Sequence, residues 1–247
     1  MQNLHSESSS SKPRIGLIQS RGIGDIVISL PIAKWYHDLG FEVIWPIDEK
    51  FYPSFKNSAD YVNFIPFKFL PSLEGFYTTP LKLLHENKCS KIFTLYSYLS
   101  NFPIHQRDLY NSLTFDQYKY AISKVPFQEK WNLFIKRDKQ REERLFTKLI
   151  KQDDYVLIQD TGSNIKAKLI IPNQYKNYIK IYINESTESI FDWLKIIENA
   201  KVLFLIDSCF ANLVEQLKIK TPKYFIFRSV CNFTPVMMSK WDILKPN

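Results

Sequence analysis

Short apolar runs alternate with longer amphipathic segments along most of the chain. Runs rich in β-branched and aromatic residues predict strands, and the segments between them carry apolar residues at helical spacing. The predicted strands are residues 14–19, 41–45, 61–65, 91–96, 155–160, 178–183, 202–206 and 223–227. Because strands that alternate with helices usually form a parallel sheet, the pattern predicts an α/β fold.

The alternation is interrupted once, by a charged segment at residues 138–151. Leu145, Phe146, Leu149 and Ile150 recur among its charges at helical spacing, so we interpret it as a helix that links two α/β halves. The predicted organisation is a disordered Ser-rich tail at 1–12, an N-terminal half at 13–137, and a C-terminal half at 138–247 that includes the linking helix.

Composition narrows the class of protein. The longest apolar runs are far shorter than the roughly 20 residues of a membrane span, and the polar N-terminus lacks an apolar leader. Cys89, Cys209 and Cys231 lack the paired spacing of a zinc or redox site, so we expect reduced thiols and a cytoplasmic protein. The formal charge of +8 favours anionic partners. Since no nucleic-acid motif accompanies it, we expect no nucleic acid and at most peripheral membrane contact.

The first strand is followed by SRGIGDIVISLP, residues 20–31. Gly22 and Gly24 permit a tight turn from strand to helix, and free N–H groups at a helix start can bind an anion. A dinucleotide fingerprint needs a third glycine where Val27 stands, and Asp25 would repel a pyrophosphate, so an NAD(P)-dependent oxidoreductase is the least favoured interpretation. Asp25 is either a residue that complements the helix dipole or a general base.

The stretch GDIVISLP, with Gly24, Asp25, Leu30 and Pro31, resembles the N-terminal signature of the heptosyltransferase-like glycosyltransferases, glycosyltransferase family nine. Residues 186–222 are similar to a second segment of that family, a helix, strand, Asp-Ser/Thr turn and helix. The resemblance implies a GT-B fold of two Rossmann-type parallel-sheet domains. It also implies that Asp25 takes the proton of the acceptor hydroxyl and that Pro31 stands at the start of the main helix. The glycines of the turn would then lie on the acceptor side.

The resemblance also implies a donor site in the C-terminal half. Asp207 and Ser208 follow the strand at 202–206, where the amides of the next helix would receive the donor diphosphate, although plain helix capping explains the same residues. The family usually continues with Gly and, further on, His, where this chain has Cys209 and Asn212.

Other donor contacts are expected in the loop after the strand at 155–160. Thr161, Ser163 and Lys166 are implied phosphate contacts, with Lys168 as a substitute cation. The family's acidic ribose contact has no assigned counterpart here, and Glu185 is the candidate for it. Only about a dozen residues separate this loop from the next strand, fewer than a further strand and crossover helix need. We therefore expect the donor domain to be abridged.

Together these features predict an inverting, metal-independent glycosyltransferase. It would move a hexosyl or heptosyl group from a nucleotide-sugar to a glycan or glycolipid hydroxyl, with no cofactor beyond that co-substrate. The alternative is a non-catalytic nucleotide- or glycan-binding relic of the same fold, suggested by the abridged half. The sequence identifies neither the donor, the acceptor nor the oligomeric state.

Overall fold

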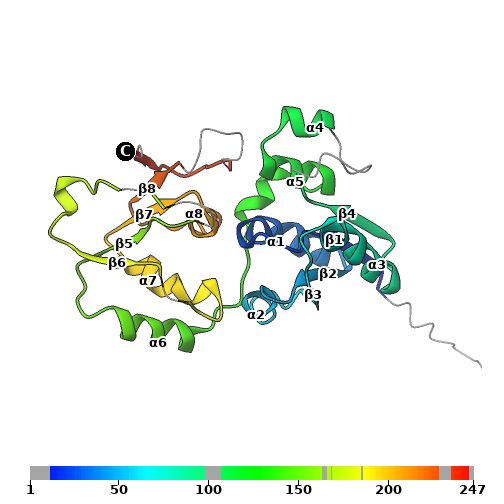
Figure 1. The fold of residues 1–247 in the computed structure, drawn as a ribbon, viewed down its shortest axis with the longest axis horizontal. Helices are drawn as coiled ribbons and strands as arrows, with labels where there is room; N and C mark the ends of the chain where they lie inside the picture. The colour runs from blue at the N-terminus through cyan, green and yellow to red at the C-terminus, as the bar shows by residue number, and fades with distance from the viewer. Residues whose placement is uncertain are drawn as a thin grey trace, which may run out of the picture.

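The structure is a computed structural model that describes residues 12–97, 107–162, 166–167, 169–184, 186–227 and 235–244. Two α/β halves lie side by side, each built on its own sheet (Figure 1). Apart from Lys12, the predicted Ser-rich tail is outside the described residues. Among the described helices, none has the length and apolar character needed to cross a membrane.

The N-terminal half contains a parallel sheet of four strands in the order β3-β2-β1-β4. The strands are β1 (Arg14–Ile18), β2 (Glu42–Asp48), β3 (Val62–Phe67) and β4 (Lys91–Thr94). The helices are α1 (Ile23–Asp38), α2 (Tyr52–Phe55), the π-helical η1 (Glu74–Thr78), α3 (Thr79–Glu86), α4 (Arg107–Ser112), α5 (Phe115–Ser123) and the 3-10 helix η2 (Phe127–Trp131).

The C-terminal half contains a parallel sheet of five strands in the order β6-β5-β7-β8-β9. The strands are β5 (Tyr155–Gln159), β6 (Ile179–Tyr182), β7 (Val202–Ile206), β8 (Lys223–Ile226) and β9 (Asp242–Leu244). The helices are α6 (Lys139–Leu149), the 3-10 helices η3 (Asn173–Tyr175) and η4 (Ile190–Trp193), α7 (Leu194–Asn199) and α8 (Cys209–Gln216).

The eight predicted strands are confirmed, and so is a helix, α6, within residues 138–151, whereas β9 was not predicted. Asp138 caps α6 by accepting a hydrogen bond of 3.0 Å from the Arg141 N–H. The chain passes from one sheet to the other between η2 and α6, and we keep the division at residue 138 as a proposal. In the described part of the β5–β6 connection, the short η3 is the only helix, so the C-terminal half is abridged as expected.

Helices α1 and α8 pack against each other between the sheets (Figure 1). Pro31 lies inside α1, so the prediction that it begins the helix is wrong; α1 starts directly after Gly22. Because proline has no N–H, the carbonyl of Val27, four residues earlier, lacks its helical donor. The Gln216 side chain of α8 donates to that carbonyl at 3.2 Å and to the Lys130 carbonyl at 3.0 Å. The proline therefore leaves the Val27 carbonyl free to accept a hydrogen bond from the other half of the protein.

The C-terminal segment ties the two halves together a second time. Glu215 of α8 accepts hydrogen bonds from the Trp131 indole of η2 at 3.1 Å and from the Ser239 N–H at 2.9 Å. Asp116 of α5 accepts from the Lys130 ammonium at 2.6 Å and from the Val236 N–H at 2.9 Å. Since one hydrophobic core cluster also runs through both halves, the space between the sheets has a fixed frame.

Candidate active site

A cleft of about 960 Å³ opens between the two halves. Its walls come from the loops that directly follow β1, β5 and β7, together with the starts of α1 and α8. Ligands of α/β folds bind at these carboxyl ends of parallel strands. Six of the predicted site residues line it: Gly22, Gly24 and Asp25 on the N-terminal wall, and Thr161, Asp207 and Ser208 on the C-terminal wall.

The turn from β1 into α1 is built around Gly22. Its φ of +83° is a conformation that side-chain-bearing residues rarely adopt, and a Cβ there would stand 2.5 Å from Asp25 Oδ2. The Tyr96 hydroxyl accepts from the N–H groups of Ser20 and Arg21 at 2.8 and 3.1 Å, which holds the turn from the side of β4. Burial raises the pKa of this hydroxyl well above its ordinary value, so it stays neutral.

Gly24 lies within α1 rather than in the turn itself. A Cβ at this position would meet the Cys209 Cα at 3.5 Å, an ordinary van der Waals distance. The first turns of α1 and α8 therefore face each other closely across the cleft. Each helix start carries partial positive charge from its aligned peptide dipoles, so an anion between them would be stabilised.

The Asp25 side chain is 24% exposed and lies on the cleft wall. Its Oδ1 is 2.9 Å from the Nζ of Lys119, a lysine of α5 whose side chain is 0% exposed. The ammonium also donates to Gln19 Oε1 at 2.7 Å and to the Leu95 carbonyl at 3.0 Å. Lys119 thus holds Oδ1 of Asp25 from the protein interior, whereas Oδ2 lies beside Gly22.

On the opposite wall, Ser208 is the N-cap of α8, as predicted. Its Oγ accepts from the Phe210 N–H at 3.2 Å and donates to Gln159 Oε1. The preceding Asp207 is largely buried, and its N–H donates to the Ile226 carbonyl at 2.9 Å. The β7–α8 turn is therefore pinned to the neighbouring strands β5 and β8.

The two departures from the family pattern both lie at the start of α8. Burial raises the pKa of the Cys209 thiol to about 12, so the thiol is protonated at neutral pH. Asn212 is buried and donates to the Ser208 carbonyl at 3.0 Å, while its Oδ1 has no hydrogen-bond partner among the described residues. A buried acceptor without a partner in a cleft wall is a position where a ligand or a water can donate.

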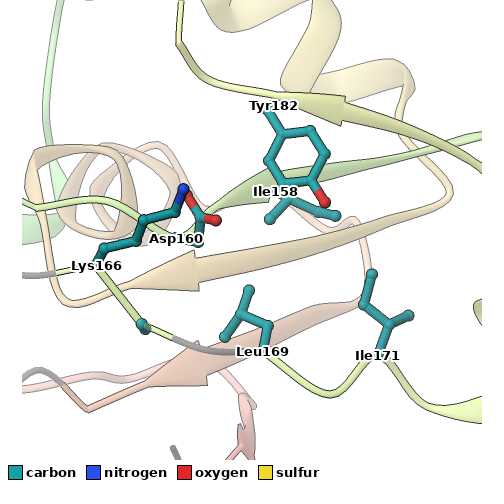
Figure 2. A pocket seen from close by; sticks show the side chains of 7 residues that line it. Ile158, Asp160, Lys166, Leu169, Ile171 and Tyr182 are labelled. Atoms are coloured by element: carbon teal, nitrogen blue, oxygen red, sulfur yellow. The ribbon is translucent and has the colours of Figure 1, made fainter.

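A smaller pocket of about 410 Å³ lies at the ends of β5 and β6. Figure 2 shows Leu169, Ile171 and Tyr182 around Ile158, with the side chains of Asp160 and Lys166 pointing toward each other. A β-bridge joins Thr161, which lines the cleft, to Lys166, which lines the pocket. Lys166 thus borders the pocket rather than the cleft. Ser163, Lys168 and Glu185 are outside the described residues.

Three aromatic side chains, those of Phe51, Phe76 and Phe115, line the N-terminal wall. The Arg21 guanidinium lies 5.7 Å from the Phe51 ring centroid and pairs with Asp48 at 3.2 Å, so its charge is already compensated.

No cluster of three or more His, Cys, Asp or Glu side chains that could hold a metal ion occurs in the described part of the chain. Cys89 and Cys209 are free thiols, and Cys231 is outside the described residues. Independence from metal stays a prediction.

Comparison with known proteins gives matches in structure only. The family 9 glycosyl transferase from Veillonella parvula DSM 2008 aligns with a TM-score of 0.60, over 94% of this chain and 87% of that one, at 13% identity. The chain has a GT-B fold. The E. coli heptosyltransferase WaaC with ADP aligns with a TM-score of 0.54, over 94% of this chain and 93% of that one, at 10% identity. The iron-containing dodecameric glycosyltransferase TibC from enterotoxigenic E. coli H10407 aligns with a TM-score of 0.55 at 12% identity, over 92% of this chain and 61% of that one. No family model and no curated protein matches the sequence.

Within this GT-B fold, sequence reasoning missed the residues that support the site. Gln19 directly follows β1 and accepts a hydrogen bond from Lys119, and Gln159 ends β5 and accepts one from Ser208. One feature of the sequence indicates that Lys119 faces the core. It is four residues after Phe115 and three before Ile122, which places it on the apolar face of α5. A lysine on such a face is either solvated at the helix edge or buried with a partner.

Proposed function

We propose that the protein is an inverting glycosyltransferase that moves a sugar from a nucleotide-sugar to a hydroxyl of a glycan or glycolipid acceptor. One observation carries the proposal: Asp25 lies across the interdomain cleft from the start of α8 at Ser208. A proton acceptor and an anion-binding helix start thus border the same space. The fold supports the proposal, since the structural neighbours are described as glycosyltransferases and one of them was determined with ADP.

In the proposed reaction, Asp25 accepts the proton of the acceptor hydroxyl as its oxygen attacks the anomeric carbon of the donor. The bond from that carbon to the diphosphate breaks, and the departing negative charge is stabilised by the first amides of α8 and the Ser208 hydroxyl. The acceptor oxygen attacks from the wall that carries Asp25, and the diphosphate leaves toward the wall that carries α8. The configuration at the anomeric carbon therefore inverts.

The donor is proposed to extend from the cleft into the smaller pocket. Leu169, Ile171 and Tyr182 offer an apolar surface for the nucleoside, and Lys166, at the pocket border, would pair with a phosphate. Thr161 lines the cleft and forms a β-bridge with Lys166 of the pocket border. We retain Ser163 as a proposed phosphate contact and Glu185 as a proposed ribose contact.

The acceptor is proposed to bind the aromatic wall. The apolar face of a sugar ring packs well on rings such as Phe51, Phe76 and Phe115, which would present one hydroxyl to Asp25.

The reaction is proposed to need no metal ion. Because protein groups are proposed to neutralise the diphosphate, we expect EDTA to leave turnover unchanged.

A non-catalytic relic of the fold is the second candidate. The abridged β5–β6 connection favours it, and so does the charge of the cleft. Among the described residues that line the cleft, Asp25 and Asp207 face a single guanidinium, Arg21, which is already paired. Such a protein would bind a nucleotide or a glycan without turnover.

The first test is a thermal-shift panel of nucleoside diphosphates, nucleotide-sugars, NAD and NADP. A ligand at 100 times its Kd adds about 2.7 kcal/mol to the free energy of unfolding. Stabilisation by one diphosphate and its sugar conjugate is expected. Stabilisation by NAD or NADP alone would revive the oxidoreductase, and silence across the panel would refute the donor site.

Two variants then assign roles. Asp25→Asn should lower transfer by about 10²–10⁴-fold, the usual contribution of a general base, with diphosphate affinity kept. Lys166→Ala should weaken diphosphate binding without loss of folding. Binding of donor with no turnover by the parent protein would identify the relic, and parental rates in Asp25→Asn would show that Asp25 is not the base.

A further inference from the structure

Two lysines of the N-terminal half, Lys119 and Lys130, have side chains that are 0% exposed. Each pairs with an aspartate, Asp25 at 2.9 Å and Asp116 at 2.6 Å. Removing an ammonium group from water costs several kcal/mol, and a buried ion pair often contributes less stability than apolar side chains of the same volume. A fully buried lysine therefore needs a specific reason, which its partner indicates.

The reason differs between the two pairs. Asp116 is also 0% exposed, and Lys130 further donates to the Val236 carbonyl at 2.6 Å, so this pair is an internal tie between η2, α5 and the C-terminal segment. Asp25 is 24% exposed in the cleft. Lys119 therefore places a buried charge directly beneath the carboxylate that a ligand can reach.

The Lys119 ammonium is held in place by two hydrogen bonds besides its ion pair. It donates to Gln19 Oε1 at 2.7 Å and to the Leu95 carbonyl at 3.0 Å, and it lies 2.9 Å from Asp25 Oδ1. The Gln19 amide is itself fixed, because its Nε2 donates to the Arg21 carbonyl at 2.7 Å. The ammonium thus has no freedom to follow a moving carboxylate.

Gly22 completes the arrangement from the other side. Asp25 Oδ2 occupies the space that a Cβ of residue 22 would need, 2.5 Å from the ideal Cβ position. With Oδ1 held by Lys119 and Oδ2 set against Gly22, the carboxylate has one defined orientation. A proton acceptor works only when it is within hydrogen-bond reach of the hydroxyl, and a misplacement of about 1 Å can cost 10²-fold in rate.

We propose that Lys119 is a positioning residue of the transfer reaction: it holds Oδ1 of Asp25 so that Oδ2 receives the acceptor proton. This role rests on the proposed function. Lys119 touches neither substrate and acts only through Asp25. Its neighbour Lys130 has the same burial and the same kind of partner but no contact with the cleft, which makes it a matched control.

The experiment compares Lys119→Met, Lys130→Met, Asp25→Asn and the double variant Lys119→Met/Asp25→Asn in the full chain. The substrate is the nucleotide-sugar selected by the thermal-shift panel, with ADP-D-β-D-heptose, present in a TibC structure, as the first probe. Release of the nucleoside diphosphate is measured with a panel of methyl glycosides as acceptors. Melting temperature and diphosphate Kd are measured for every variant.

We expect kcat to fall about 10–10²-fold in Lys119→Met with the diphosphate Kd unchanged. Lys130→Met should lose melting temperature but keep the parental kcat. The double variant should be no slower than Asp25→Asn, since a residue that acts through Asp25 has no effect once that carboxylate is gone. If Lys119→Met does not fold, Gln19→Met, which frees one anchor of the ammonium, should lower kcat by a smaller factor at parental Kd.

Three results would overturn the inference. Parental kcat in Lys119→Met, or in Gln19→Met where that variant replaces it, refutes it while Asp25 stands as the base. Equal loss of kcat in the Lys119 and Lys130 variants assigns both lysines to stability alone. A parental rate in Asp25→Asn removes the proposed base and this inference with it.

Discussion

Glu215 is the most heavily hydrogen-bonded carboxylate of the interface between the halves, and Glu215→Gln tests how much that interface contributes to stability. Its Oε1 accepts from the Trp131 indole at 3.1 Å and from the N–H groups of Met238 and Ser239 at 2.5 and 2.9 Å. Its Oε2 accepts from the Ser239 hydroxyl and from the Trp241 indole at 2.8 Å. A glutamine offers one oxygen, so its amide would face at least two donors.

The expected loss can be worked out in two ways from the same hydrogen bonds. Two hydrogen bonds to a charged acceptor are worth about 1.5–3 kcal/mol each, which gives about 3 kcal/mol or more. Burial alone would raise the pKa of Glu215, but the hydrogen bonds from Ser239, Trp241 and Met238 outweigh it and lower the pKa from 4.5 to about 2. At about 1.4 kcal/mol per pH unit, that difference also corresponds to about 3 kcal/mol.

The sign of the pH dependence follows from the lowered pKa. The unfolded chain binds a proton at Glu215 more readily than the folded protein does, so the contribution is complete above pH about 4.5 and is lost as the pH falls toward 2. Urea unfolding at pH 7, followed by tryptophan fluorescence, should therefore show Glu215→Gln about 3 kcal/mol below the parent. At pH 3 the gap should be clearly smaller.

The control is Glu143→Gln, which removes an exposed pair with Lys195 and should cost less than about 1 kcal/mol. A loss below 1 kcal/mol for Glu215→Gln at pH 7, or an equal loss at pH 3, would refute the reasoning.

The remaining predictions concern the start of α1 and its contact with α8. In thermal unfolding, Gly22→Ala should lower the free energy of unfolding by about 1–3 kcal/mol, because alanine is strained at a φ of +83°. It should also lower turnover, because its Cβ displaces the Asp25 carboxylate. Gly24→Ala, whose Cβ has space, should lower the free energy of unfolding less, and equal losses would contradict this account. Gln216→Leu removes the donor to the carbonyls of Val27 and Lys130 and should cost about 2–4 kcal/mol in urea unfolding. Adding Pro31→Ala restores an N–H for the Val27 carbonyl and should recover part of that loss; no recovery would show that the proline and the glutamine are not coupled.

The fold was predictable because the central strands of each sheet are buried on both faces. A run such as residues 202–206 is apolar throughout and fully buried, which is the pattern of a central parallel strand. Strand β9 escaped prediction because Asp242–Leu244 is too short for any periodicity, and its pairing with β8 depends on where the C-terminal segment returns. The prediction for Pro31 was wrong because proline is common in the first turn of a helix, where no N–H is needed. Inside a helix it is tolerated when another donor binds the carbonyl that it leaves without a partner. Here that donor is Gln216, which is far away in the sequence.

The site was predictable to the extent that topology assembles it. Asp25, Thr161 and Ser208 each follow a parallel strand, so the sheets alone bring them to the edges that face each other. Lys119 is different in kind. Its spacing in α5 indicates that it faces the core, but a helical face specifies burial and not a partner. Whether the ammonium meets Asp25, Asp116 or no carboxylate depends on how α5 packs on the β1–α1 turn. Asp116, three residues earlier on α5, pairs with Lys130 instead. The residues that contact a ligand can therefore be read from strand ends, whereas the residues that orient them are selected by tertiary packing and emerge only in the assembled fold.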